Sequence, residues 1–343
     1  MSADPVILGA FSKNVLFSDF EPDELERLAG IFFLKAFATE TPILAEEEPN
    51  EGLGVVIHGS LHSSKNVPGF GAKELSRLQP GDIVGEVSFV DELPHAASIR
   101  CADDAILALT RRADARKLLE DSVPIRLKLY KIFTQTISRH LRNVNDRLNA
   151  FFQQDSAAER IPDGAPPRPG ARLGFEKVTQ LLRTFDLFAS LSAEEIELLA
   201  LVIDEVPVDK DQVIFREGSR GETLFVVAEG AVRVSKFFAG FGEEALTIVN
   251  PGEFFGDMSV FDDLPRSATA IGNAPGTLLL SIGRSSIGEL CELNLPGGCR
   301  LYEILARIQC RRLRNTINTV SFWQILTGGS DGAQTLEGPL PAD

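Results

Sequence analysis

The sequence predicts a mainly β protein of the α+β class, built from two copies of one domain with helices at both ends. Three observations support this prediction: a repeat of constant offset, short apolar segments separated by glycine and proline, and flanking segments with helical spacing. With 343 residues, of which 44% are hydrophobic and 24% charged, the chain is long enough for two domains that each bury a core.

The repeat has a constant offset of 171 in residue number. Gly59 and Gly230 are related by this offset, as are Gly85 and Gly256. The offset stays constant over most of one copy, which indicates duplication of a whole domain and not a solenoid of short units. We therefore expect the same fold twice.

The domain boundaries follow from the repeat and from one segment rich in proline and glycine. Residues 161–172, IPDGAPPRPGAR, cannot sustain a helix or a central strand, so we expect a linker there. The first domain then covers 1–160 and the second covers 173–327. The tail at 328–343 is polar and contains glycine and proline, and we expect it to be disordered.

Each copy begins with a short amphipathic helix, expected at 21–31 in the first copy and at 192–203 in the second. Strand-like segments follow, and in the second copy they cover 212–215, 223–228, 231–237, 246–249 and 278–282. Many short strands at such spacing predict an antiparallel sandwich or barrel.

Each copy is also expected to end in a helix. In the first copy, apolar residues recur every three or four positions and form a seam: Tyr130, Phe133, Ile137, Leu141, Val144 and Leu148. Such a seam suits packing against another helix or against a second copy of itself. In the second copy Arg312 interrupts the seam, so we expect a less regular coiled coil there.

Charge and composition restrict the possible partners. The net charge of -15 disfavours nucleic acid and anionic membranes, because both attract proteins with a positive field. No apolar run reaches the roughly 18 residues of a membrane span, and no signal-peptide pattern opens the chain. The cysteines, Cys101, Cys291, Cys299 and Cys310, form no CxxC pair and are expected to be free thiols. These features predict a soluble cytoplasmic protein without a metal site.

The sequence contains no motif for catalysis. The P-loop and HExxH patterns are absent. Gly240-Phe241-Gly242 followed by Ala245 fits the phosphate turn of a dinucleotide-binding fold, but strand-like segments flank it, so a hairpin loop is the better interpretation. We expect a protein that is not an enzyme.

The stretch FFGDMSVFDDLPRSATA, which begins at Phe254, contains the candidate binding residues. Gly256 has no side chain, so the backbone can approach a ligand closely. A helical turn over Asp257–Val260 would point free N–H groups at an anion. The planar guanidinium of Arg266 suits bidentate pairing with phosphate oxygens. On spacing alone, a surface salt bridge between this arginine and Asp262 or Asp263 explains the residue better.

This stretch and the residues before it resemble the cyclic nucleotide-binding domain family. The resemblance rests on four ordered segments: FREGSRGETLF from Phe215, EGAV from Glu229, GDMS from Gly256 and LPRSAT from Leu264. It extends over nearly the whole chain, twice. It favours phosphate binding by Arg266 over the surface salt bridge.

The resemblance implies a jelly-roll β-sandwich flanked by helices, with a phosphate-binding cassette and a C-terminal helix that closes over the base. It implies that Arg266 meets the cyclic phosphate of cAMP or cGMP and that Asp257 replaces the family's ribose-binding glutamate. The full set of ligand-binding residues would be Gly256, Asp257, Met258, Ser259, Arg266, Ser267 and Ala268. Phe322 or Trp323 is a candidate lid over the base, although an aromatic residue near a helix end more often serves packing.

The first copy carries a degenerate version of this site. It keeps Gly85, Glu86 and Ser88 but has His95 in place of the arginine. A neutral imidazole would deprive phosphate of its main counter-charge. The turn formed by Gly218 and Gly221 in the second copy is also lost, because Glu47 and Asn50 replace its glycines. We expect no cyclic nucleotide in the usual mode here, and a structural or dimerising role instead.

These observations predict a non-enzymatic sensor whose second domain binds cAMP or cGMP and whose last helix then moves. The readout would lie in a protein partner or in a homodimer formed through the C-terminal helices, and the tandem arrangement resembles kinase regulatory subunits. One alternative is a scaffold that keeps the fold without binding a ligand. Another is a sensor of a different nucleotide, such as cyclic di-GMP.

Overall fold

The computed structural model describes residues 3–150, 174–238 and 242–328. The expected linker at 161–172 lies outside the described residues, and so does the expected tail apart from Gly328. Gly240 and Phe241 of the expected hairpin loop lie outside them as well. The linker, the disordered tail and the hairpin loop therefore stay predictions.

The chain divides into two compact units, Met1–Phe151 with Leu305–Asp343, and Phe152–Ile304. The sequence repeat assigns 173–327 to the second domain, whereas the second compact unit ends inside the last helix. The C-terminal part of that helix groups with the first unit.

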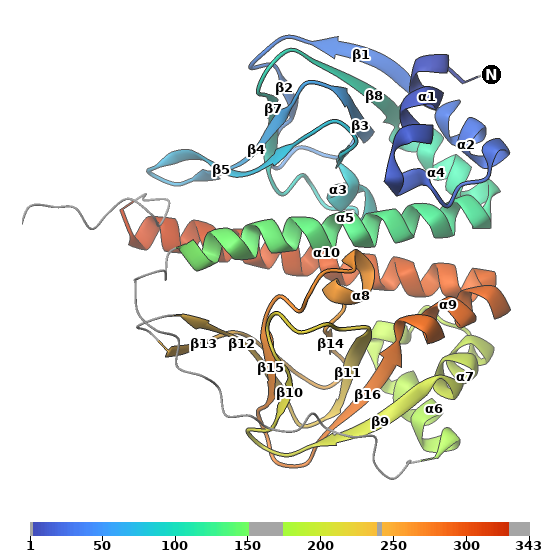
Figure 1. Ribbon diagram of the computed structural model, residues 1–343, viewed down its shortest axis with the longest axis vertical. Helices are drawn as coiled ribbons and strands as arrows, with labels where there is room; N and C mark the ends of the chain where they lie inside the picture. The colour runs from blue at the N-terminus through green and yellow to red at the C-terminus, as the bar shows by residue number, and fades with distance from the viewer. Residues whose placement is uncertain (1–2, 151–173, 239–241, 329–343) are drawn as a thin grey trace, which may run out of the picture. The chain divides into compact units, whose positions relative to one another are not determined.

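The first unit is a β-sandwich with helices before and after its strands (Figure 1). Its strands are β1 Phe33–Phe37, β2 Pro42–Leu44, β3 Gly52–His58, β4 Leu61–Val67, β5 Gly71–Leu78, β6 Ile83–Val84, β7 Ser98–Cys101 and β8 Ala105–Arg111. They form two antiparallel sheets in the orders β1-β8-β3-β6 and β2-β7-β4-β5. Both sheets contribute apolar side chains to one core, which includes Val56, Leu61, Leu78, Ile99 and Leu107.

The helices of the first unit are α1 Pro5–Lys13, η1 Val15–Phe17, α2 Pro22–Ala29, α3 Glu86–Asp91, α4 Arg112–Asp121 and α5 Val123–Ala150. The apolar seam expected in α5 is buried along its whole length, from Tyr130 to Leu148. The last helix, α10, covers Leu295–Leu326, and its part from Leu305 on belongs to this unit. That part lies beside α5 (Figure 1), and Gln309 donates a hydrogen bond of 2.9 Å to the hydroxyl of Ser138.

The second unit repeats the sandwich. Its strands are β9 Ile203–Val208, β10 Val213–Phe215, β11 Thr223–Glu229, β12 Val232–Phe238, β13 Gly242–Val249, β14 Phe254–Phe255, β15 Thr269–Gly272 and β16 Thr277–Gly283. Their sheet orders, β14-β11-β16-β9 and β10-β15-β12-β13, repeat those of the first unit. Its helices are α6 Phe175–Thr184, η2 Asp186–Phe188, α7 Ala193–Leu201, α8 Met258–Asp262, α9 Arg284–Leu293 and the start of α10. The two predicted jelly-roll domains are confirmed.

The offset of 171 between the copies changes near the end of the strands. It relates β7 to β15, but β8 and β16 are offset by 172, because the loop before β16 is longer than the loop before β8 by a single position. The change comes after the candidate binding residues of both copies. Positions offset by 171 are therefore structural equivalents throughout both candidate sites.

One expectation for a single element needs correction. The helix expected to reach Ile203 ends at Leu201, because Ile203 already begins β9 and pairs with Ile282 of β16. The helix expected at the end of the second copy is present as α10 and continues past Arg312, where the apolar seam is interrupted, while the irregular coiled coil stays a prediction. Helical hydrogen bonds join backbone groups, so one polar side chain at the seam does not end the helix.

Candidate functional site

The segment after β14 of the second unit holds the residues expected to bind phosphate. Gly256 has a φ of +77°, a left-handed conformation that glycine adopts without strain, and it turns the chain into α8. The expected helical turn is present as Met258–Asp262, with Asp257 as its N-cap residue. A loop then leads through Arg266 into β15. The order of these elements brings Arg266 back over Gly256.

The side chain of Arg266 is 6% exposed and its guanidinium is held by oxygens of the same site. Nη1 donates to the carbonyl of Gly256 at 2.5 Å and to the hydroxyl of Ser259 at 2.9 Å, and Nη2 donates to the carbonyl of Thr223 at 2.7 Å. The alternative of a surface salt bridge does not describe this residue, since its side chain is buried and Asp263 pairs with Arg284 at 2.7 Å.

Two further residues of the second unit shape the space around Arg266. The centre of its guanidinium lies 4.1 Å from the ring centroid of Phe215, a distance typical of a cation–π contact. A Cβ on Gly221 would lie only 2.0 Å from Nε of Arg266. Any larger residue at position 221 would therefore collide with the arginine in its present position.

Burial makes Arg266 an electrostatically costly residue. It lowers the pKa of the guanidinium to about 10, and the nearby carboxylate of Asp257 opposes this shift. Asp257 is itself buried, with 1% exposure. Within the described residues, Nε of Arg266 has no hydrogen-bond partner. At neutral pH the site thus holds a buried cation with an unused donor, which suits an anionic ligand with several acceptor oxygens.

The other predicted residues of this site lie in the same short segment. The hydroxyl of Ser267 is 3.5 Å from the sulfur of Met258, and Ala268 is buried just before β15. Phe322 and Trp323 lie in the part of α10 that groups with the first unit, and Phe322 is 57% exposed. Their role as a lid of the second site stays a prediction.

The first unit brings together all four residues of the degenerate site. Nδ1 of His95 lies 2.9 Å from the hydroxyl of Ser88, the position where Ser259 meets Arg266 in the second unit. Gly85 turns the chain into α3 with a φ of +86°. The carboxylate of Glu86 is buried and its Oε1 lies 3.1 Å from Nδ1 of His140 on α5.

His95 is 6% exposed, and burial lowers the pKa of its imidazole. The positive charge of Arg314 lowers the pKa further, while Glu86, Glu48 and Glu51 oppose the shift. The imidazole is therefore held in its neutral form more firmly than an exposed histidine. This supports the expectation that the first site lacks the counter-charge of Arg266.

Sequence reasoning noted Asn50 as part of a lost turn but did not recognise it as a site residue. Its amide donates to the carbonyls of Gly52, at 3.0 Å, and Gly85, at 2.9 Å. In the second unit the equivalent carbonyls, of Thr223 and Gly256, accept from the guanidinium of Arg266. Asn50 therefore serves the same acceptors as Arg266. The signal in the sequence was that Asn50 replaces Gly221.

The backbone frame around these side chains is the same in both units. His95 exchanges two hydrogen bonds with the turn before it, to the carbonyl of Glu48 and from the amide of Glu47, both at 2.9 Å. Arg266 does the same with Ser219 and Gly218, at 2.8 and 2.9 Å. Glu47 adopts a φ of +67° where the second unit has Gly218. The first site thus differs in side chains and charge while its backbone frame is kept.

The predicted absence of a metal site and of a membrane span can be examined for the described part of the chain. There, no group of three or more histidine, cysteine or acidic side chains could hold a metal ion. No helix in these ranges has the length and apolar content needed to cross a bilayer. Cys101, Cys291, Cys299 and Cys310 are buried, and none of them forms a disulfide bond within the described residues.

Comparison with known proteins identifies the family of both domains. The family model of the cyclic nucleotide-binding domain matches residues 34–122 and 205–294, which together make up more than half of the chain. The two matches include 85–95 of the first candidate site and 256–268 of the second, but not the candidate lid residues Phe322 and Trp323.

Similar proteins include kinases and a bacterial regulator. The chain is 24% identical over 294 residues to the "cGMP-dependent protein kinase egl-4" of Caenorhabditis briggsae, and the match covers 84% of this chain and 32% of the kinase. It is 34% identical over 128 residues to the "Cyclic AMP receptor protein" of Thermus thermophilus, covering 37% of this chain and 57% of that protein. The chain therefore spans about a third of the length of the kinase.

Among solved structures, the regulatory domain of Toxoplasma gondii PKA in a co-crystal with cAMP matches at 17% identity and a TM-score of 0.32. The match covers 83% of this chain and 90% of that one. The two sandwiches, their cassettes and the matches of the family model lead to one conclusion. The chain belongs to the cyclic nucleotide-binding domain family and carries two such domains in tandem.

Proposed function

We propose that the chain is a non-enzymatic regulatory protein whose second domain binds a cyclic mononucleotide, cAMP or cGMP, through Arg266. Binding shifts an equilibrium between positions of α10, and a protein partner or a second copy of the chain reads the change. The names of two relatives, a cGMP-dependent kinase and a cyclic AMP receptor protein, support a cyclic mononucleotide as the ligand.

The observation that carries this proposal is the state of Arg266. Its guanidinium is buried, its pKa is lowered to about 10, and its Nε has no partner within the described residues. A cyclic phosphate would supply negative charge and acceptor oxygens at the same place. Because the arginine is already held by Gly256, Ser259 and Thr223, the ligand has little side-chain entropy to remove.

Asp257 supplies the second part of the proposed interaction. An aspartate carboxylate is an acceptor suited to a ribose hydroxyl, and it follows Gly256, whose bare backbone allows close approach. We assign the ribose to Asp257, the phosphate to Arg266, and the remaining contacts to Met258, Ser259, Ser267 and Ala268 with their backbone groups.

A scaffold without ligand is the second candidate function, and the first domain gives a specific reason to consider it. There, Asn50 satisfies the cassette carbonyls internally, so the fold is maintained without a phosphate-binding arginine. The second domain argues against a scaffold for the whole chain, because a buried arginine is retained at a cost in desolvation.

Calorimetric titration of the full chain with cAMP, cGMP and cyclic di-GMP tests the proposal. We expect cAMP or cGMP to bind, and Arg266→Ala to weaken that binding by about 100-fold or more, since two charge-assisted hydrogen bonds are lost. Arg233→Ala is the matched control, because Arg233 lies in the same unit but pairs with Asp211 and Glu243 at 2.8 Å.

Arg233→Ala is expected to leave the affinity unchanged. Absence of binding by all three nucleotides would favour the scaffold. Binding of cyclic di-GMP alone would assign the site to a different signalling nucleotide. Equal losses in Arg266→Ala and Arg233→Ala would show that the effect comes from fold stability and not from the phosphate contact.

A further inference from the structure

The first unit contains a cavity of about 70 Å³ between its second sheet, the cassette helix α3, and the helices α5 and α10. The cavity has a polar end formed by Glu86, Ser88, His95 and His140. A cavity of this volume holds several water molecules or part of a small organic ligand. The site called degenerate is therefore hollow and not filled by its own side chains.

The polar end is ordered by contacts among its own members. Ser88 and His95 are 2.9 Å apart, and Glu86 and His140 are 3.1 Å apart. The side chain of Glu86 is only 3% exposed. The remaining wall is largely apolar and includes Ile99, Val144 of α5, and Leu313 and Ile317 of α10. A ligand that fits this lining has an apolar or aromatic face and a polar edge.

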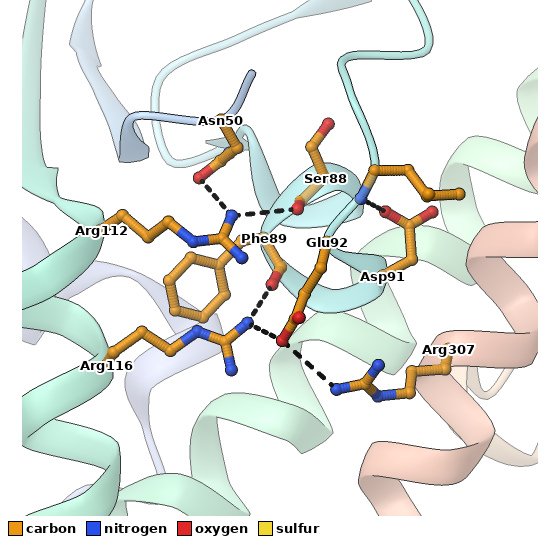
Figure 2. A network of polar contacts seen from close by, with 9 residues as sticks. Asn50, Ser88, Phe89, Asp91, Glu92, Arg112, Arg116 and Arg307 are labelled. Atoms are coloured by element: carbon orange, nitrogen blue, oxygen red, sulfur yellow. Dashed lines mark hydrogen bonds and ion pairs between the residues drawn. The ribbon is translucent and has the colours of Figure 1, made fainter.

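The charge of the cavity excludes a phosphate. Its lining includes the carboxylate of Glu86 but no lysine or arginine among the described residues. Four arginines lie near α3, three of which are drawn in Figure 2, and none of them belongs to the cavity lining. Arg112 and Arg116 donate to the carbonyls of Ser88, at 3.4 Å, and Phe89, at 2.9 Å.

The other two arginines come from α10. Arg314 binds the carboxylate of Asp91 with two hydrogen bonds of 2.6 and 3.0 Å. Arg307 lies 3.6 Å from the carboxylate of Glu92 (Figure 2). These contacts fix the outer side of α3 and keep the cationic groups paired with acids. The polar end of the cavity itself consists of one buried carboxylate, two imidazoles and the hydroxyl of Ser88.

We propose that the first domain binds an uncharged ring compound with neighbouring hydroxyl groups, of the class of nucleosides without phosphate. The hydroxyls donate to the carboxylate of Glu86, an arrangement that gives charge-assisted hydrogen bonds. Ser88 and His95 bind a further polar atom. The ring lies against the apolar wall and contacts Leu313 and Ile317, so the ligand holds the end of α10 on the first unit.

The experiment is a calorimetric titration of the full chain with adenosine, guanosine and inosine. We expect at least one of them to bind at one site per chain. Glu86→Gln keeps the size of the side chain and removes its charge, and it should weaken binding by about tenfold. Glu92→Gln is the matched control, because Glu92 follows the same helix but pairs with Arg116 at 2.7 Å outside the cavity.

A second variant fills the space without changing charge. Ala97→Phe places a ring in the cavity, which Ala97 lines, and should abolish nucleoside binding, while circular dichroism checks that the domain is folded. Lack of binding by all three nucleosides would overturn the proposal, and so would binding that survives both Glu86→Gln and Ala97→Phe. Neither result depends on whether Arg266 binds a cyclic nucleotide, which the titration with cAMP and cGMP decides separately.

Discussion

The two candidate sites of this chain share one backbone frame, and they differ in the side chain that donates hydrogen bonds to its carbonyl groups. In the second domain the guanidinium of Arg266 donates to two backbone carbonyls, and Gly221 leaves the space that it needs. In the first domain the amide of Asn50 donates to the equivalent carbonyls, and His95 takes the place of the arginine. Where one domain has the arginine it has a glycine opposite, and where the other lacks the arginine it has an asparagine in place of that glycine.

This difference shows that loss of a phosphate-binding arginine involves more than loss of charge. Removing the arginine alone would leave two buried carbonyls without donors, which costs stability. The asparagine supplies those donors from the position that is equivalent to Gly221. The first domain is therefore adapted to the absence of the arginine, and one substitution does not reverse that adaptation.

The largest expected effect comes from restoring both members of the pair in the first domain. His95→Arg together with Asn50→Gly gives the new guanidinium its acceptors and its space, and should raise the number of cyclic nucleotides bound from one per chain to two. Each single variant should still bind one. Equilibrium dialysis with labelled nucleotide measures the count.

Two outcomes of that experiment would contradict the comparison. A second bound nucleotide in His95→Arg alone would show that Asn50 does not block the arginine. A folded double variant that still binds one nucleotide would show that other features, such as the Glu86–His140 contact, prevent binding in the first domain.

A smaller effect is expected when space is removed in the second domain. Gly221→Ala places a Cβ 2.0 Å from Nε and 2.3 Å from Cζ of Arg266, so the guanidinium must shift. We expect roughly tenfold weaker binding of the cyclic nucleotide, because a displaced guanidinium forms hydrogen bonds of poorer geometry with the phosphate oxygens. Gly288→Ala is the control, since a Cβ there meets no atom within 4 Å. Unchanged affinity in Gly221→Ala would mean that nucleotide binding does not depend on the exact position of the Arg266 guanidinium.

The smallest effect concerns pH. The pKa of His95 is lower in the folded domain than its ordinary value of 6.5, so below about pH 6.5 the unfolded chain binds a proton that the folded domain resists. Stability of the first domain should therefore fall as the pH drops below this value. Thermal denaturation between pH 7 and pH 5 should show a weaker pH dependence in His95→Gln, while the exposed His58→Gln should behave like the parent chain. Identical curves for all three would rule out the titration of His95 as the cause.

Much of the fold could be predicted from the sequence, because a duplicated domain presents every signal twice. The strand at 223–228 and the helix at 21–31 were placed to within a few residues. The strand β9 was partly mistaken for the end of a helix, since Ile203 continues the apolar spacing of the preceding helix while its backbone pairs with β16. Sheet pairing between distant segments overrides such local patterns.

The candidate site was predictable only in part. Arg266 and His95 could be compared because the repeat aligns them, but the role of Asn50 depends on its contacts with the carbonyls of Gly52 and Gly85, which no motif displays. The cavity of the first domain was hidden for a similar reason. Its wall includes Leu313 and Ile317, which follow the whole second sandwich in the sequence. A sequence pattern within one domain cannot show that these two residues contact the first domain.

The central claim is that the chain carries one phosphate-competent site, in its second domain. The most direct test counts the cAMP or cGMP bound per chain at saturation, in the parent protein and in Arg266→Ala. The account predicts one nucleotide per chain in the parent and none in the variant at the same concentration. Two nucleotides in the parent, or one that remains in Arg266→Ala, would contradict it.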